Sequence, residues 1–230
     1  MPVSEQPRTC RHPLDSPKPH GADEDEATLD VRTRRTRARL REAVLRLASE
    51  RPVEEISVAE LVRAARINRT TFYKHAESPV TLLEQVLYAD LDRIRTAWLA
   101  DIAAAELSAR EVWERASGAL VAHLEDRDAL YTAGLAGRRS ASLNRLLVDH
   151  FTASVRALLD QDPRRVPDGE GTASWRAEAH SRFLAHGEAG LVEAWLSLPR
   201  PRDPRLFVSA AKSALAPWLD GPSHADTPAH

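Results

Sequence analysis

The chain has 230 residues, of which 43% are hydrophobic, 29% charged and 5% aromatic, and its formal net charge is −2 at pH 7. This length allows one large or two modest domains with a buried core, and the scarcity of aromatic residues favours helices over a β-sandwich or barrel. The single cysteine, Cys10, excludes an intramolecular disulfide and a cysteine-based zinc site, and it fits a reducing cytoplasm.

The chain is not expected to enter a membrane. No early stretch has the apolar region of a signal peptide, and no apolar run approaches the roughly 20 residues that span a bilayer. Even the stretch 143–159 is interrupted by Asp149, His150 and Arg156. We therefore expect a soluble, cytoplasmic protein.

Charge is distributed unevenly along the chain. Residues 32–75 hold 12 Lys or Arg against 5 Asp or Glu, a net charge of +7, whereas residues 1–31 carry −4 and residues 76–230 carry −5. A basic segment within an otherwise acidic chain is typical of a nucleic-acid-binding domain attached to a non-binding body.

The first 31 residues are predicted to be a disordered tail, because they contain five prolines, an acidic run and almost no large apolar residue. A first helix is predicted over 32–51, ending before Pro52. Its N-terminal part carries Arg32, Arg34 and Arg35, whose charges oppose the helix dipole unless an external anion compensates. A DNA phosphate is a natural candidate for that anion, and these side chains could also reach the adjacent minor groove.

Two short helices joined by a tight turn are predicted over 57–76. Ser57 and Glu60 match the S-x-x-E capping box that begins a helix, and Asn68 can cap the second helix. Phe72 is expected to anchor the second helix in the core. That helix can then display donors, a phenol and cations to a DNA major groove, although the spacing alone also fits an ordinary helical hairpin with a solvated face.

The rest of the chain reads as a helical body. Ser78 and Pro79 are predicted to begin a long helix that runs to about residue 104 without a break. Shorter helices follow, of which the first begins at a second capping box, Ser108 and Glu111. The expected ranges are 108–126, 127–136 (ending at Gly137), 140–161, 173–197 and 203–218, with a frayed segment at 220–230.

No motif supports an enzyme or a cofactor site. The sequence contains no G-x-S-x-G elbow, no G-x-G-x-x-G and no P-loop. His180 and His186 are six residues apart, which is not the spacing that places two metal ligands on one helix face, and His123 and His150 are isolated. We therefore predict no catalysis, no cofactor and no metal.

The segment SVAELVRAARINRTTFYKH at 57–75 resembles the second and third helices of the TetR family of bacterial transcription regulators. The arginine-rich first helix and the long helix from Ser78 support the resemblance, and GEAGLVEAWLSL at 187–198 is similar to the penultimate helix of one group of the family. The resemblance implies an all-α fold with a helix-turn-helix DNA-binding domain at 32–77 and a regulatory and dimerisation domain at 78–219.

The resemblance also implies a homodimer that places two recognition helices in successive major grooves of a near-palindromic operator. The positions that match the family's DNA contacts are Ser57, Arg69, Thr70, Thr71, Tyr73, Lys74 and His75. Three departures from the family pattern suggest a looser head or weaker phosphate binding. Arg66 stands at a usual turn glycine, Ala76 at a usual large apolar residue, and Pro79 at a usual lysine.

The family's body binds a small molecule and forms the dimer through its last two helices. Candidates for the ligand pocket are Trp98, Trp113, Tyr131, Phe151 and Trp175. Candidates for the dimer interface are Leu191, Trp195, Leu206, Phe207, Leu215 and Trp218, each of which could instead belong to the core of one subunit.

The sequence thus predicts a transcriptional regulator, by family habit a repressor, that binds DNA as a homodimer and is released by an effector. The alternative is a TetR-like helical dimer scaffold that binds neither DNA nor an effector.

Overall fold

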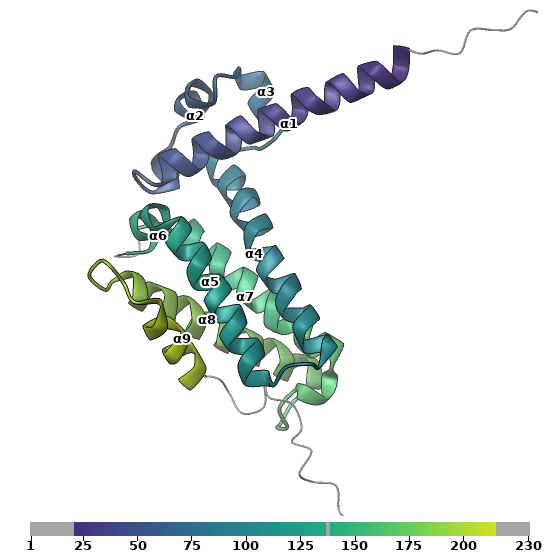
Figure 1. Cartoon of the computed structure of the whole chain (residues 1–230), viewed down its shortest axis with the longest axis vertical. Helices are drawn as coiled ribbons and strands as arrows, with labels where there is room; N and C mark the ends of the chain where they lie inside the picture. Colours follow the sequence, from purple (N-terminus) through teal and green to yellow (C-terminus); the bar gives the residue numbers. More distant parts are fainter. Residues whose placement is uncertain (1–20, 137–138, 215–230) are drawn as a thin grey trace, which may run out of the picture.

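The computed structural model describes residues 21–136 and 139–214, and within these ranges all regular secondary structure is helical, as predicted. Helices α1–α3 form an N-terminal head, α4 runs from the head into the body, and α5–α9 complete the body (Figure 1). The helices are α1 (Gly21–Ala48), α2 (Val58–Ala65), α3 (Arg69–Tyr73), α4 (Pro79–Ala104), α5 (Ala109–Asp126), α6 (Asp128–Leu135), α7 (Ala141–Gln161), α8 (Ala173–Leu196) and α9 (Pro204–Ser213), with short 3₁₀ helices at Val53–Glu55 and Pro163–Arg165.

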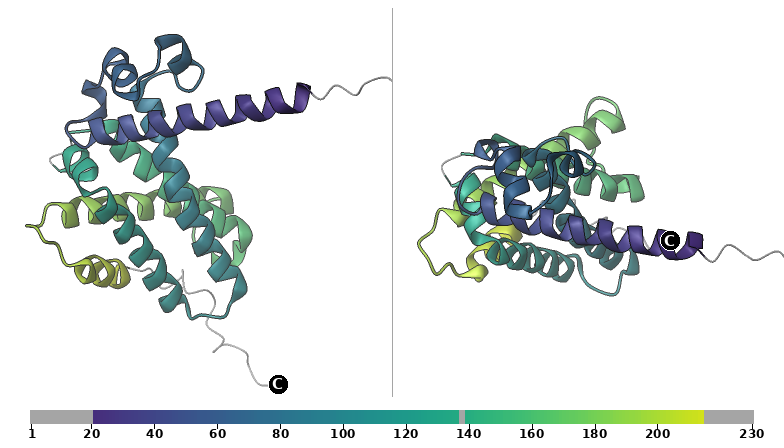
Figure 2. Two further views of the ribbon diagram at one scale, coloured as in Figure 1. Left: turned by 45° about the horizontal axis from the view of Figure 1, so that its top comes forward. Right: turned by 90° about the horizontal axis from the view of Figure 1, so that it is seen from above.

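Helix α1 is longer than the sequence suggests. It begins at Gly21, so the predicted disorder is wrong for residues 21–31, while residues 1–20 lie outside the described part of the chain. Figures 1 and 2 show the N-terminal part of α1 extending away from the rest of the protein.

The head packs around α1 and continues into the body as one core. Leu40 and Val44 of α1, Leu61 of α2 and Phe72 of α3 are completely buried in this core. The first turns of α4 join them, and Leu87 of α4 is likewise fully buried. The head is therefore not a separate globule on a flexible tether.

The predicted helix starts are confirmed where a polar cap was identified. Ser78 Oγ accepts a hydrogen bond from Thr81 N at the start of α4, with Pro79 in its first turn. Ser108 and Glu111 form the complete capping box of α5.

At the C-terminal end of the described chain, α9 ends at Ser213. The expected continuation to 218 lies outside the described residues, as does Gly137. No helix in the described ranges is long and apolar enough to cross a membrane.

Head and body are joined by buried polar contacts around Asp90 of α4, which is 3% exposed. Its carboxylate accepts hydrogen bonds from Arg41 of α1 at 3.0 and 2.7 Å, and from Arg127 at the start of α6 at 2.6 Å. Arg93, one turn along α4, adds a third guanidinium at 2.6 Å. Burial alone would raise the pKa of Asp90, but the hydrogen bond from Arg41 and the three positive charges hold that pKa below its ordinary value.

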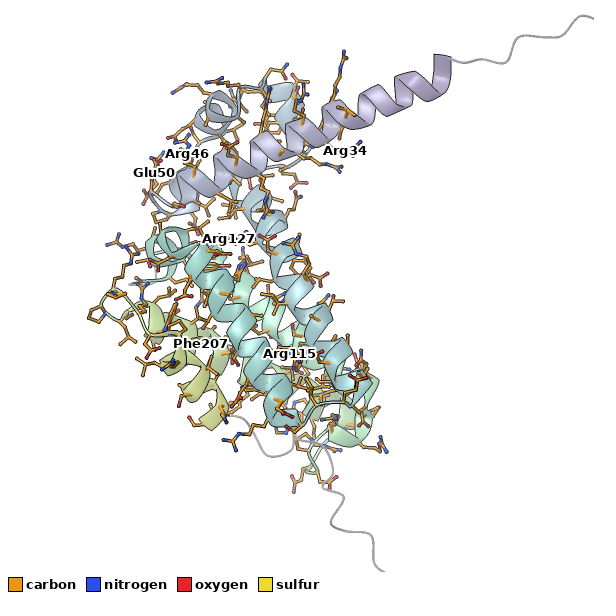
Figure 3. All side chains as sticks on the ribbon, viewed as in Figure 1. Arg34, Arg46, Glu50, Arg115, Arg127 and Phe207 are labelled. Carbon is orange, nitrogen blue, oxygen red and sulfur yellow. The ribbon has the colours of Figure 1, made fainter. Side chains whose placement is uncertain are left out.

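A second contact crosses the same junction. Glu54, in the 3₁₀ helix of the head, accepts hydrogen bonds from Ser140 Oγ at 2.8 Å and from Ser142 N at 3.1 Å, both at the start of α7. Figure 3 shows Arg127 at the level where the body meets α1 and α4. Two independent polar contacts thus fix how the head sits on the body.

Replacing Asp90 with Asn should destabilise the protein by about 3 kcal/mol, because Arg41 and Arg127 would keep partly buried charges without a counter-ion. Urea denaturation followed by circular dichroism measures the change. Glu50→Gln is the control, since Glu50 lies just after α1 in an exposed pair with Arg46, and its loss should change stability by no more than about 0.5 kcal/mol. Equal stability of the two variants would show that the Asp90 contacts do not hold the junction.

Candidate DNA-binding surface and ligand cavity

Side-chain caps position the two helices of the helix-turn-helix. Ser57 Oγ accepts a hydrogen bond from Glu60 N at 3.2 Å, and Asn68 Oδ1 accepts one from Thr71 N at 2.7 Å. The Glu60 carboxylate also pairs with Arg51, whose hydrogen bond lowers the pKa of Glu60. The caps therefore fix the starts of both α2 and α3, as the sequence predicts.

The turn between α2 and α3 uses a left-handed residue that is not glycine. Arg66 has φ 53° and ψ 48°, and its N–H donates to Arg63 O at 3.2 Å. Ile67 N donates to Val62 O at 3.0 Å, which completes a Schellman ending of α2. A side chain at such a position costs roughly 1 kcal/mol relative to glycine, so the family's usual glycine would relieve strain here.

Helix α3 presents most of the predicted DNA-binding residues on one outer surface. Phe72 is completely buried and anchors the helix, while the adjacent Tyr73 is 55% exposed. Arg69, Thr70 and Lys74 are exposed. The remaining predicted residues differ in exposure: Ser57, Arg32, Arg34 and Arg35 are exposed, whereas Thr71 and His75 are half-buried.

One basic residue of this surface was missed by the sequence analysis. Burial first, and then the charges of Arg37 and Lys74, lower the pKa of His75. Arg37 of α1 therefore lies close to the end of α3 and adds a cation to the surface. Its position one turn before the buried Leu40 was the available sequence signal. The lowered pKa favours the neutral form of His75, and a neutral imidazole can still donate one N–H to a phosphate.

The body contains a cavity of about 620 Å³ lined by α4, α5, α7, α8 and α9. Three of the five predicted ligand residues line it: Trp98, Trp113 and Phe151. The two indole rings meet edge to face, with their centroids 6.4 Å apart. The size falls in the range of small-molecule sites.

The other two predicted ligand residues do not line this cavity. Tyr131 is completely buried, and its hydroxyl lies 2.7 Å from Nε2 of His123, also buried. Burial raises the pKa of Tyr131 and lowers that of His123 to about 4, so both are neutral members of the core. Trp175 is 63% exposed near the start of α8. Aromatic spacing along a helix did not distinguish pocket from core or surface at these two positions.

The cavity wall carries two titratable groups, His150 of α7 and Glu188 of α8. Burial lowers the pKa of His150 to about 4, and it raises the pKa of Glu188 to about 7. The sequence analysis did not single out Glu188. The available signal was a carboxylate within the otherwise small and apolar run GEAGLV at 187–192.

Two predicted dimer-interface residues belong instead to the core of one subunit. Trp195 and Phe207 are 3% and 1% exposed, and their rings meet edge to face 6.1 Å apart. These two residues therefore join α8 to α9 within the chain, because each of them buries its apolar ring against the other helix. Leu191 lines the cavity. Leu215 and Trp218 lie outside the described residues.

Other residues of α8 and α9 leave apolar surface uncovered. Phe183 is 78% exposed and Leu206 is 54% exposed. Leu198, just after α8, is 38% exposed. Leu206 was a predicted interface residue, whereas Phe183 was not. Large exposed side chains of this kind mark surfaces that can receive another protein.

No metal centre is found in the described part of the chain, where no group of three or more His, Cys, Asp or Glu side chains is placed to hold an ion. The two candidate sites in these ranges are the basic surface of the head and the largely apolar cavity of the body.

No protein-family model and no curated protein sequence matches the chain, whereas solved structures do. A TetR transcriptional regulator from Streptococcus agalactiae gives a TM-score of 0.55 at 15% identity, covering 82% of this chain and 97% of that chain. NalD, the secondary repressor of a multidrug efflux pump in Pseudomonas aeruginosa, gives a TM-score of 0.51 at 21% identity. The match covers 79% of this chain and 94% of NalD. RolR in complex with resorcinol gives a TM-score of 0.50 at 18% identity. The match covers 79% of this chain and 88% of RolR.

These likenesses define the class of fold, an all-helical protein with an N-terminal helix-turn-helix head and a helical body. It is the fold of the TetR family of transcriptional regulators, and the resemblance identified at 57–75 is thereby confirmed at the level of the fold.

Replacing Arg66 with Gly should stabilise the protein relative to Arg66→Ala by about 1 kcal/mol, because both variants remove the same charge and only glycine relieves the left-handed strain. Chemical denaturation of the two variants measures the difference. Equal stabilities would mean that the turn between α2 and α3 carries no strain.

Replacing Glu188 with Gln should make stability less dependent on pH. Between the ordinary pKa of 4.5 and about 7, the folded protein holds more protons at this site than the unfolded chain, so this group's contribution to stability falls as pH rises. The variant should therefore match the parent near pH 4.5 and exceed it by about 3 kcal/mol at pH 8. A constant difference across this range, measured by urea denaturation, would contradict the raised pKa.

Proposed function

We propose that the protein is a DNA-binding transcriptional regulator, in the repressor mode, that binds a near-palindromic operator as a homodimer and is released by a small-molecule effector. The observation that carries the proposal is the anchored helix α3, which buries Phe72 and displays Arg69, Thr70, Tyr73 and Lys74 beside the basic α1. A short helix that is anchored on its buried face and polar on its exposed face can enter a major groove and contact base edges.

The side chains divide into base readers and phosphate contacts. Arg69 can donate two hydrogen bonds to O6 and N7 of guanine, and Thr70 can offer a hydroxyl or methyl group to a base edge. Phosphate contacts are assigned to Ser57, Thr71, Tyr73, Lys74 and His75, which would fix the register of the head on DNA. Arg32, Arg34 and Arg35 of α1 would contact phosphates or the neighbouring minor groove.

The homodimer is proposed to form through α8 and α9. Three side chains of these two helices and the loop between them leave apolar area in water: Leu198, Leu206 and Phe183, the last of which also lines the cavity. A symmetric pair would place two copies of α3 on one side of the assembly, as a palindromic site requires.

The cavity is proposed to be the effector site. Leu91, Ile94 and Trp98 of α4 line it, and the same helix carries Asp90, which holds Arg41 of α1. A ligand that prefers one position of α4 would therefore favour one placement of the head. It can shift DNA binding only by as much as its affinity differs between the two placements.

DNA recovered from the protein's own genome by the purified protein supplies the test of DNA reading. The logarithm of the binding constant for the recovered site should fall linearly with the logarithm of the salt concentration. The slope should be about −0.9 for each phosphate that the protein neutralises. Flat salt dependence and no footprint would favour the helical dimer scaffold without DNA binding, and steady turnover of a substrate would point to an enzyme.

Arg69→Ala should cost about 1–3 kcal/mol on the recovered site and relax base preference at one position of each half-site. Lys74→Ala should weaken all sequences alike and reduce the salt slope by about 1 per subunit. Arg115→Ala is the control, because Arg115 lies on the body, where it pairs with Asp101 (Figure 3). Uniform weakening by all three variants would contradict the assignment of Arg69 to a base.

A further inference from the structure

We propose that the cavity selects an organic cation, a protonated amine on an apolar or aromatic body, with Glu188 as the counter-ion. This inference rests on the proposed function only in taking the cavity as the effector site. Its chemistry follows from the residues of the wall.

The wall is almost entirely apolar, with one acidic group. Within the described part of the chain, Glu188 is the only acidic residue that lines the cavity, and no hydrogen bond or ion pair links it to another described residue. The rest of the cavity wall comes from α4, α5, α7 and α9, and most of it is apolar, including Trp98 and Trp113. Glu188 is half-buried, so its carboxylate has lost part of its water without gaining a partner.

No cation of the described chain compensates Glu188. From α7, the titratable group on the wall is His150, which is neutral at physiological pH because burial lowers its pKa to about 4. Lys212 of α9 is paired with Glu114 of α5 and does not line the cavity. The segments of α4, α5 and α9 on the wall contribute no titratable side chain. The site therefore has one acidic group and no fixed positive charge.

Three classes of ligand meet this site differently. A purely apolar ligand leaves the carboxyl group without a partner, and an anionic ligand places a second negative charge beside it. A protonated amine supplies the missing charge and donates hydrogen bonds to both carboxylate oxygens. The aromatic rings of Trp98, Trp113 and Phe151 add favourable quadrupoles for a cation and apolar area for its body.

A matched series of probes tests the charge preference: 6-phenylhexylamine, 6-phenylhexanol and 6-phenylhexanoate, which share one body and differ in the head group. Titration calorimetry on the full-length protein without DNA measures binding directly. The amine should bind at least about tenfold more tightly than the alcohol, and the carboxylate should bind most weakly.

The variant Glu188→Gln keeps the side-chain volume and removes the charge, so it should abolish the preference for the amine. Glu125→Gln is the control, because Glu125 is exposed on α5 outside the cavity and the change in net charge is the same. Circular dichroism confirms that each variant is folded.

The pH dependence of the parent protein gives a second readout that needs no variant. Glu188 has a pKa of about 7 in the free protein, whereas the bound cation favours the ionised form. Affinity for the amine should therefore rise about tenfold from pH 6 to pH 8, with release of a proton, and affinity for the alcohol should not.

The inference is overturned if the amine fails to bind, if the alcohol or carboxylate binds as well as the amine, or if Glu188→Gln keeps the preference. These outcomes are separate from the test of DNA reading. Selective amine binding without any change in DNA affinity would leave the ligand class standing and remove effector release from the proposed function.

Discussion

The main polar contact that places the head on the body is one buried carboxylate, Asp90, with the three guanidinium groups around it. Two of these come from other elements, Arg41 of α1 and Arg127 at the start of α6, so the cluster ties the head, the long helix and the body together. A buried charge is stable only when its partners are in place, which makes this junction sensitive to small displacements. The contact of Glu54 with the start of α7 reinforces the same orientation.

This junction would link the cavity mechanically to the proposed DNA-binding surface. Leu91 lines the cavity and directly follows Asp90, and Ile94 and Trp98 continue the wall along α4. A ligand that displaces this part of α4 also displaces the carboxylate that holds α1. Because the core is continuous from head to body, the head has no independent freedom to absorb such a shift. The two proposed sites are thus linked by one helix.

Local features of the fold could be predicted from the sequence, because they depend on neighbouring residues. The caps at Ser57 and Ser108, the burial of Phe72 and the uninterrupted α4 are of this kind. Features set by distant residues could not be predicted. The partners of Asp90 lie 49 and 37 positions away. Whether Trp195 packs within its own chain or against a second subunit depends on the position of α9, which the sequence does not show. Likewise, α1 begins at Gly21 although the composition of residues 21–31 is typical of disorder.

Two carboxylates of the chain, the buried Asp90 and the partly buried Glu188, have pKa values shifted in opposite directions. Burial disfavours the charge of both, but three arginines reverse the effect at Asp90, whereas nothing reverses it at Glu188. Asp90 is therefore ionised and structural, while Glu188 has a pKa of about 7 and reduces stability above its ordinary pKa. A glutamine of nearly the same shape would avoid that cost at this position. Glu188 weakens the fold and lines an apolar cavity, and a ligand that pairs with its carboxylate would explain why it is there. Such a ligand would have to carry the positive charge that the wall lacks.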